Sequence, residues 1–124
     1  MTITLRDTKG SALTYAELDA NFTHLKSDIK SVQNITGPGV ISLTTGVTLI
    51  TTTGSNQAFS LADGTEGQIK IISMKVNGGN ATITPDNLVG YTAITFNNVH
   101  DNVHLLYQST GWTIIALQHA TRID

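Results

Sequence analysis

The sequence predicts a mainly β protein that carries one helix near its N-terminus. Of its 124 residues, 20 are threonine and 11 are glycine, whereas only 13% are charged. Threonine suits a pleated, half-exposed surface and glycine suits tight turns, so this composition favours a β module. Apolar residues recur with the period of a helix over residues 14–36 and with the period of strands from Val40 onward. We therefore expect a short coiled-coil stalk followed, at residues 40–124, by a small antiparallel β-sandwich or jelly-roll-like head.

Residues 1–13, MTITLRDTKGSAL, precede the helix and are too few to form a domain. The segment TITL alternates like a strand, and the residues after it are polar. We interpret these residues as an arm that docks on a larger particle, although a disordered terminus has the same appearance. The expected docking residues are Thr2, Ile3, Thr4, Leu5, Arg6 and Asp7.

The helix has a strong start signal at Thr14. Glu17 follows three residues later, so the two side chains can each bond the other residue's backbone N–H in a capping box. Leu13 and Leu18 are spaced to pack together as a hydrophobic staple. The sequence Gly-Pro-Gly at 37–39 predicts the helix end and a hinge before the head.

The apolar residues of this helix form one narrow seam with alternating spacings of three and four. Such spacing is typical of a coiled coil, and so narrow a stripe favours packing against other helices. We expect identical chains to join along it; a helix folded back onto its own β domain is the alternative. The seam does not fix the number of chains. Its residues are Tyr15, Leu18, Phe22, Leu25, Ile29 and Val32.

Eight short strands are expected in the head, separated by glycine, asparagine and aspartate turns. Residues 71–76 are expected to return through NGGN into 81–84 as a hairpin, and 103–108 through STG into 112–117. The alternation slips at Ile71-Ile72, which suggests a bulge or a strand buried on both faces. The eight segments are 40–44, 47–52, 57–61, 68–76, 80–84, 91–96, 102–108 and 112–118, and the expected core anchors are Phe59, Phe96, Tyr107 and Trp112.

Charge and cysteine content exclude several classes of function. The net charge is −2 and the pI about 6.0, which gives little electrostatic support for binding nucleic acid or an anionic membrane. The absence of cysteine removes disulfides and thiolate metal sites. Neither a signal peptide nor an apolar run of membrane-spanning length is recognisable, so we expect a soluble protein with no visible secretion route.

Candidate catalytic groups do not assemble in the sequence. His100 and His104 are four apart in or beside a strand, a span of roughly 13 Å that is too long for one shared metal ion. We expect all four histidines, His24 and His119 included, at the surface or in turns. The acids Asp63, Glu66, Asp86 and Asp101 lie at expected turns, where such side chains bond local backbone. We expect no catalytic, metal or cofactor site; a symmetric assembly that gathers one histidine per chain around an ion stays as an alternative.

The stretch TLRDTKGSALTYAELDANFTHL, with its core at residues 10–22, is similar to an N-terminal segment of tail-fibre and other virion structural proteins of tailed bacteriophages. This resemblance implies a homotrimer that is made in the host cytoplasm and fixed to the particle by its N-terminus. It also implies a projecting C-terminal head without catalysis.

Long tail fibres have extended shafts and large tips, whereas this chain has one small head. The length therefore favours a short fibre or a capsid decoration (head fibre) protein, with a capsid or tail protein as docking partner. Two alternatives stay open. One is a carbohydrate-binding, tail-fibre-like module for host adsorption through exposed aromatic residues, and the other is a glycan hydrolase assembled between chains.

Overall fold

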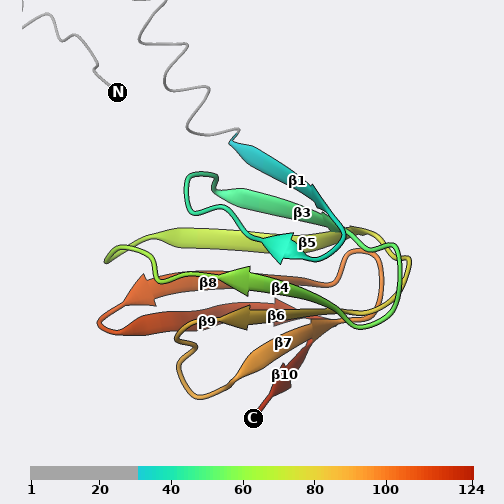
Figure 1. Cartoon of the computed structure of the whole chain (residues 1–124). Helices are drawn as coiled ribbons and strands as arrows, with labels where there is room; N and C mark the ends of the chain where they lie inside the picture. The colour runs from blue at the N-terminus through green and yellow to red at the C-terminus, as the bar shows by residue number, and fades with distance from the viewer. Residues whose placement is uncertain (1–30) are drawn as a thin grey trace, which may run out of the picture. The chain divides into compact units, whose positions relative to one another are not determined.

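We describe residues 31–124 from a computed structural model of the chain (Figure 1). The chain divides into two units, Met1–Ser31 and Val32–Asp124. The predicted docking arm, the cap at Thr14 and Glu17, and the seam from Tyr15 to Ile29 therefore lie outside the described residues. The described part is mainly β, contains no helix, and is built from ten strands.

Ten strands follow one another along the described chain. They are β1 (Val32–Thr36), β2 (Gly39–Val40), β3 (Val47–Thr51), β4 (Gln57–Leu61), β5 (Ile69–Val76), β6 (Ala81–Pro85), β7 (Ala93–Phe96), β8 (Asn102–Gln108), β9 (Gly111–Gln118) and β10 (Thr121–Ile123).

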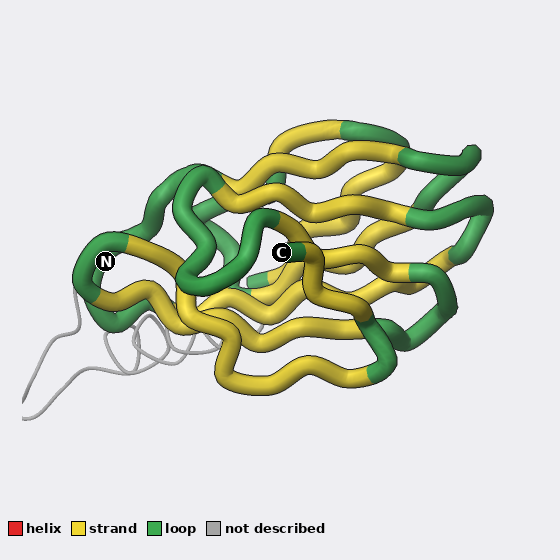
Figure 2. The backbone as a smooth tube through the Cα atoms, turned by 90° about the horizontal axis from the view of Figure 1, so that it is seen from below, coloured by secondary structure: helices red, strands yellow, loops and turns green. Residues whose placement is uncertain are grey.

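The strands form two five-stranded sheets that stack as two layers (Figure 2). Sheet A has the order β1-β3-β5-β8-β9, and sheet B has the order β10-β7-β6-β4-β2. The first six strands alternate between the sheets, and each runs parallel to its neighbour in the same sheet among these six. The later strands join in antiparallel pairs. The sheets are therefore mixed, and the expectation of an antiparallel sandwich was wrong for the first half of the head.

In this first half the chain winds between the two sheets, so that successive strands of one sheet stack in parallel. The stacked positions are 24 residues apart between β3 and β5 and between β4 and β6, but 15 residues apart between β1 and β3 and 20 between β2 and β4. Gln57 pairs with Ala81, and the pairing continues to the end of both strands. At the bend before these strands, Asn56 donates its backbone N–H to Asn80 Oδ1 (2.9 Å), and Asn80 Nδ2 donates to Asn56 Oδ1 (3.0 Å). Identical residues in successive turns thus satisfy each other's polar groups across the stack.

The bend at Asn77–Asn80 is therefore not a hairpin turn, and the predicted return of 71–76 into 81–84 was wrong. β5 and β6 lie in different sheets. Thr52 Oγ1 accepts from Gly78 N (2.9 Å) and donates to Gly79 O (2.6 Å), which ties this bend to the turn stacked against it. A Cβ on Gly78 would run into the Thr52 carbonyl, so glycine is required here for close backbone approach.

The second predicted hairpin is confirmed. β8 pairs with β9 in antiparallel fashion, with Gln108 opposite Gly111 at the turn. Seven of the eight expected strands are present as β3 to β9, and the expected strand at 40–44 is reduced to the two residues of β2. β1 and β10 were not expected from the pattern.

The start of the head also differs from the sequence-based boundaries. Residues 32–36 form β1 and not the end of a helix over 14–36, so the head begins at Val32 and not at residue 40. Val32 is consequently a strand residue and not a helical seam residue, and 37–39 is a turn inside the head instead of a hinge before it. Ile35, which lies off the seam, packs against the core from β1, and the strand pairs in parallel with β3. Val32 follows Ile29 at a spacing of three residues, but this spacing alone does not distinguish the end of a helix from the start of a strand.

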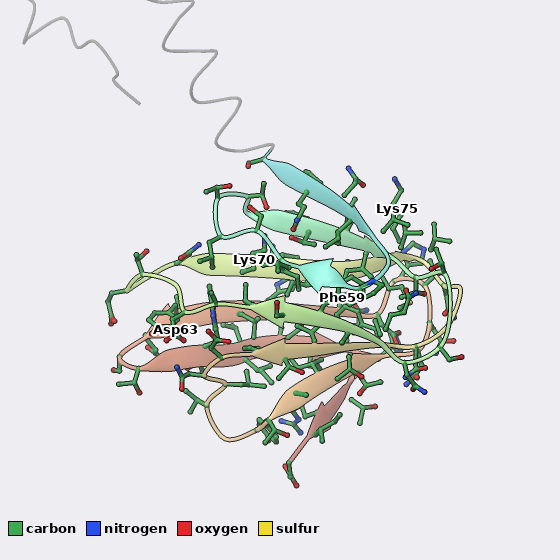
Figure 3. All side chains as sticks on the ribbon, viewed as in Figure 1. Phe59, Asp63, Lys70 and Lys75 are labelled. Atoms are coloured by element: carbon green, nitrogen blue, oxygen red, sulfur yellow. The ribbon has the colours of Figure 1, made fainter. Side chains whose placement is uncertain are left out.

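The core lies between the two layers and is anchored by three aromatic residues. Phe59 (Figure 3), Phe96 and Trp112 are each at most 1% exposed, as predicted. Each such buried side chain contributes on the order of 1.5–3 kcal/mol of transfer free energy. Tyr107 is only half-buried; its ring meets that of Trp112 edge to face, with centroids 5.2 Å apart. Trp112 Nε1 donates to Ala62 O (2.9 Å), so its polar atom is satisfied.

The slip in alternation at Ile71-Ile72 has a different origin from a bulge at that point. β5 alternates regularly there, because Lys70, Ile72 and Met74 face inward and Ile71 faces outward. The bulge comes later, where Ile50 pairs with Met74 but Thr51 pairs with Val76, so that Lys75 is skipped. Because Lys70 faces inward, the order of apolar and polar residues did not indicate which side of this strand is buried.

Candidate functional site

The acidic and histidine residues singled out from the sequence stay dispersed. Within residues 31–124, no three His, Asp or Glu side chains come close enough together to hold a metal ion. His104 lies on β8, whereas His100 and His119 lie in turns with φ values of 75° and 59°. The structure thus brings none of these histidines into a shared site within one chain.

The acids lie at turns, as predicted, and three of them bind neighbouring polar groups. Asp101 is 1% exposed, and its Oδ2 accepts from the backbone N–H groups of Asn97 (2.8 Å) and Asn98 (3.0 Å). Glu66 Oε2 accepts from Ser109 N (2.8 Å). Asp63 (Figure 3) accepts from Asn87 Nδ2 with both carboxylate oxygens, each at 2.9 Å. Asp101 thus bonds the backbone of its own turn, as turn chemistry predicts. Asp63 and Glu66 instead join loops that are far apart in the chain, so the prediction of local bonds was wrong for them.

The acids near the β8–β9 hairpin also influence Tyr107. Burial raises the pKa of the Tyr107 hydroxyl above its usual value, and the negative charges of Asp63 and Glu66 raise it further. All three causes disfavour the phenolate. Tyr107 therefore stays a neutral hydroxyl over the physiological pH range.

The most distinctive surface is the outer side of sheet A. One row of outward-facing side chains crosses all five strands in register: Val32, Val47, Ile71, His104 and Ala116. Four of these five residues are apolar. Residues at opposing positions on neighbouring strands have Cβ atoms only about 5 Å apart, so Val32, Val47 and Ile71 form a continuous apolar band that ends at His104, with Ala116 beyond it.

Further apolar residues widen this band. Ile69 and Leu106 are paired on one side of it, and Leu49 lies on the other. Ile115 is the extra residue of a bulge in β9 and is 57% exposed, while Ile69 is 55% exposed. We call the whole set the sheet A face; it comprises Val32, Val47, Leu49, Ile69, Ile71, His104, Leu106, Ile115 and Ala116.

The row of side chains next to the apolar row of the sheet A face is mostly polar and contains no charged residue. The next row across the sheet contains Asn34, Ser73, Asn102 and Gln118 around Leu49. Lys75 (Figure 3), at the bulge of β5, donates from Nζ to Asn34 Oδ1 in this row (3.3 Å). An apolar centre with an amide rim and no carboxylate has the composition of a protein–protein contact.

Sheet A carries its other lysine on the inward side. Lys70 is fully buried between the layers (Figure 3), and its Nζ donates to Thr45 O (2.8 Å) and Thr45 Oγ1 (2.9 Å). Burial lowers the pKa of this ammonium group from 10.5 to about 8. Both acceptors are neutral oxygens and no carboxylate of the described residues balances the charge, so burial of the ammonium group reduces the stability of the head at neutral pH.

Sequence reasoning missed both the sheet A face and the buried lysine. Which residues of β3 and β5 face outward follows from which of them face inward. Lys70 faces inward although lysine usually faces solvent, so the sequence pattern did not reveal the outward-facing residues. One signal was present: Asn56 and Asn80 are 24 residues apart, as are Gly54 and Gly78, and this period marks the stacked turns.

Searches against protein-family models give no match, and no curated protein matches this chain. Residues 31–124 contain no helix long and apolar enough to cross a membrane. The function therefore has to be inferred from the surface of the head and from the sequence before it.

Proposed function

We propose that this chain is a non-enzymatic bacteriophage virion structural protein, a homotrimeric short fibre or capsid decoration protein. Residues 1–13 dock on a capsid or tail protein of the particle. The segment 14–31 joins three chains through Tyr15, Leu18, Phe22, Leu25 and Ile29, and the β head projects outward.

The observation that carries this proposal is the place where the sheet A face begins. Val32 is the first residue of the described head, is 44% exposed, and opens the apolar row that crosses sheet A. The seam residues end at Ile29, three positions before it. Apolar residues that join chains before the head are thus followed directly by an apolar surface on the head.

A second copy of this chain is the occupant that best fits the sheet A face. Around a threefold axis the equivalent residues of the three copies come together near the axis, so a charged residue there would meet like charges. The sheet A face and the row beside it contain no Asp, Glu, Lys or Arg, so this repulsion does not arise. A strongly charged partner would find no complementary group there.

The number of chains and the position on a virion come from the resemblance of residues 4–25 to phage structural proteins. A head of about 90 residues buries a limited fraction of its surface alone, so association of three copies adds stability where a single chain lacks it. Structural appendages need binding surfaces and not reactive groups, which agrees with carboxylates that fasten loops.

The first test is the mass of the full-length protein in solution, measured by sedimentation equilibrium at micromolar concentration. We expect three times the 13.2 kDa mass of one chain. Replacing Leu25 and Ile29 together with serine should give lower-mass species, because both changes place hydroxyl groups in the seam. A monomeric wild-type protein would contradict the proposal.

The second test concerns docking. Deleting residues 2–12 should abolish binding to the phage particle, but the shortened protein should still be a trimer in solution. Particles that retain the shortened protein would show that the arm is not the anchor. Localisation of the wild-type chain on intact particles by electron microscopy separates a capsid position from a tail position.

A further inference from the structure

An open cleft with a volume of about 520 Å³ lies at one end of the head, away from the residues of the sheet A face. It is bounded by the segment 84–92, which connects β6 to β7, and by Thr110 and Gly111 at the β8–β9 turn. Ligand sites in proteins commonly have volumes of this order.

The walls of this cleft are fixed by backbone hydrogen bonds to the core of the head. Trp112 N donates to Asn87 O (2.8 Å), and Val89 N donates to Trp112 O (2.9 Å). Gly111 lies so close to Asn87 that a Cβ there would be 3.0 Å from its carbonyl oxygen. A cleft held against a buried tryptophan needs little ordering when a ligand binds.

Tyr91 supplies an aromatic surface in the cleft and is itself held in place. The guanidinium carbon of Arg122 lies 4.7 Å from the centre of the Tyr91 ring, a cation–π contact. Arg122 is positioned by β10, which pairs with β7. Thr92 N also donates to Ile123 O (2.8 Å), so the segment that bears Tyr91 is joined to the same strand.

The remaining lining is rich in hydrogen-bonding groups and carries little net charge. Hydroxyl groups come from Thr84 and Thr110, whereas the hydroxyl of Thr92 already donates to Ile123 O (3.1 Å) and can only accept from a ligand. Asp86 contributes the one charged side chain of the lining. A phosphate or other anion would be repelled by Asp86. A cation would compete with Arg122, which already occupies a cation–π position on Tyr91.

We propose that this cleft binds a neutral carbohydrate. The Tyr91 ring packs against the apolar C–H face of a sugar ring, and the Asp86 carboxylate accepts hydrogen bonds from adjacent sugar hydroxyls. The hydroxyls of Thr84 and Thr110 in the lining can both donate and accept, which suits a ligand whose hydroxyl groups do the same. No bond of the sugar is broken.

Saturation-transfer NMR on the full-length protein tests this, with a panel of neutral hexoses, N-acetylhexosamines and their disaccharides as probes. We expect transfer to at least one sugar at millimolar concentration. Tyr91→Ala should weaken binding at least tenfold, and Asp86→Asn should weaken it severalfold while preserving shape. Thr95→Ala, on β7 outside the cleft, is the matched control and should bind like wild type.

Folding of each variant is checked by the emission of Trp112, the one tryptophan of the sequence, which is fully buried. If Tyr91→Ala fails to fold, the exposed Asp86→Asn variant decides the matter. Absence of transfer to every sugar, or equal binding by the wild type and both cleft variants, overturns the proposal. The trimer is judged separately by sedimentation, so failure of one proposal leaves the other standing.

Discussion

The two outer surfaces of the sandwich share one core but differ in chemistry. The row across sheet A is valine, valine, isoleucine, histidine and alanine, whereas the corresponding row across sheet B is Ala58, Thr82, Thr95 and Thr121. The next row of sheet B aligns Val40, which is 67% exposed, with Ser60 and Thr84. Neither surface carries a charged side chain in these rows, but the first row of sheet B has three hydroxyl groups where the row across sheet A has none.

The threonine residues of the head are therefore not distributed evenly between its two outer surfaces. β-branched residues fit a pleated surface whether they end in a methyl group or a hydroxyl, so strand formation does not require the difference. Contact with another protein, in contrast, requires methyl groups at these positions and not hydroxyl groups, because apolar surface is stabilised by removal from water. We therefore assign sheet B to solvent and the sheet A face to copies of the same chain.

We expect the largest difference between the two outer surfaces from a charge placed on each of them in turn. Ile71→Lys, at the centre of the sheet A face, should weaken self-association at least about a hundredfold, because an unpaired buried charge costs several kcal/mol. Thr82→Lys on sheet B should leave association unchanged. Sedimentation at several concentrations measures both. Equal behaviour of the two variants would show that sheet A is not covered.

A second prediction contrasts the inner and outer sides of sheet A through its two lysines. The unfolded chain holds the Lys70 proton up to a pKa near 10.5, and the folded head releases it near 8. The unfolded state thus binds more protons between these values, so the free energy of unfolding rises with pH. From pH 7 to 9.5 we expect Lys70 to contribute an increase of roughly 2 kcal/mol.

Urea unfolding at a series of pH values measures this slope. Lys70→Met should flatten it, because the buried charge is removed. Lys75→Met, on the same strand but exposed, is the control and should retain the wild-type slope. If both variants follow the wild type, Lys70 is not held as a desolvated cation.

We expect the smallest effect from exchanging one methyl group for a hydroxyl group. Val47→Thr gives sheet A a residue of the sheet B kind and should weaken association about tenfold, or about 1.4 kcal/mol, because a hydroxyl is buried without a partner. Thr95→Val makes the reverse change on sheet B. We expect its mass in solution to equal that of the wild type; a higher mass would mean that apolar character alone decides which surface associates.

Local sequence patterns determined much of the head. The strands β3 to β9 follow from apolar alternation bounded by turn residues, and the β8–β9 hairpin follows from the short STG connection. Phe59, Phe96 and Trp112 are buried as their size and apolarity predict. Asp101 binds the backbone of its own turn. Each of these depends on residues within a few positions of one another, so the sequence suffices.

Only the tertiary structure decided which strands pair and which side of each strand faces out. β5 could have paired with β6 through Asn77–Asn80, but its edges are taken by β3 and β8, and the bend instead stacks against Thr52 of the preceding turn. That competition for edges involves residues far apart in the chain. The same pairing turns Lys70 inward and Ile71 outward. A period of two specifies alternation but not its phase, and the phase is fixed by packing across the core.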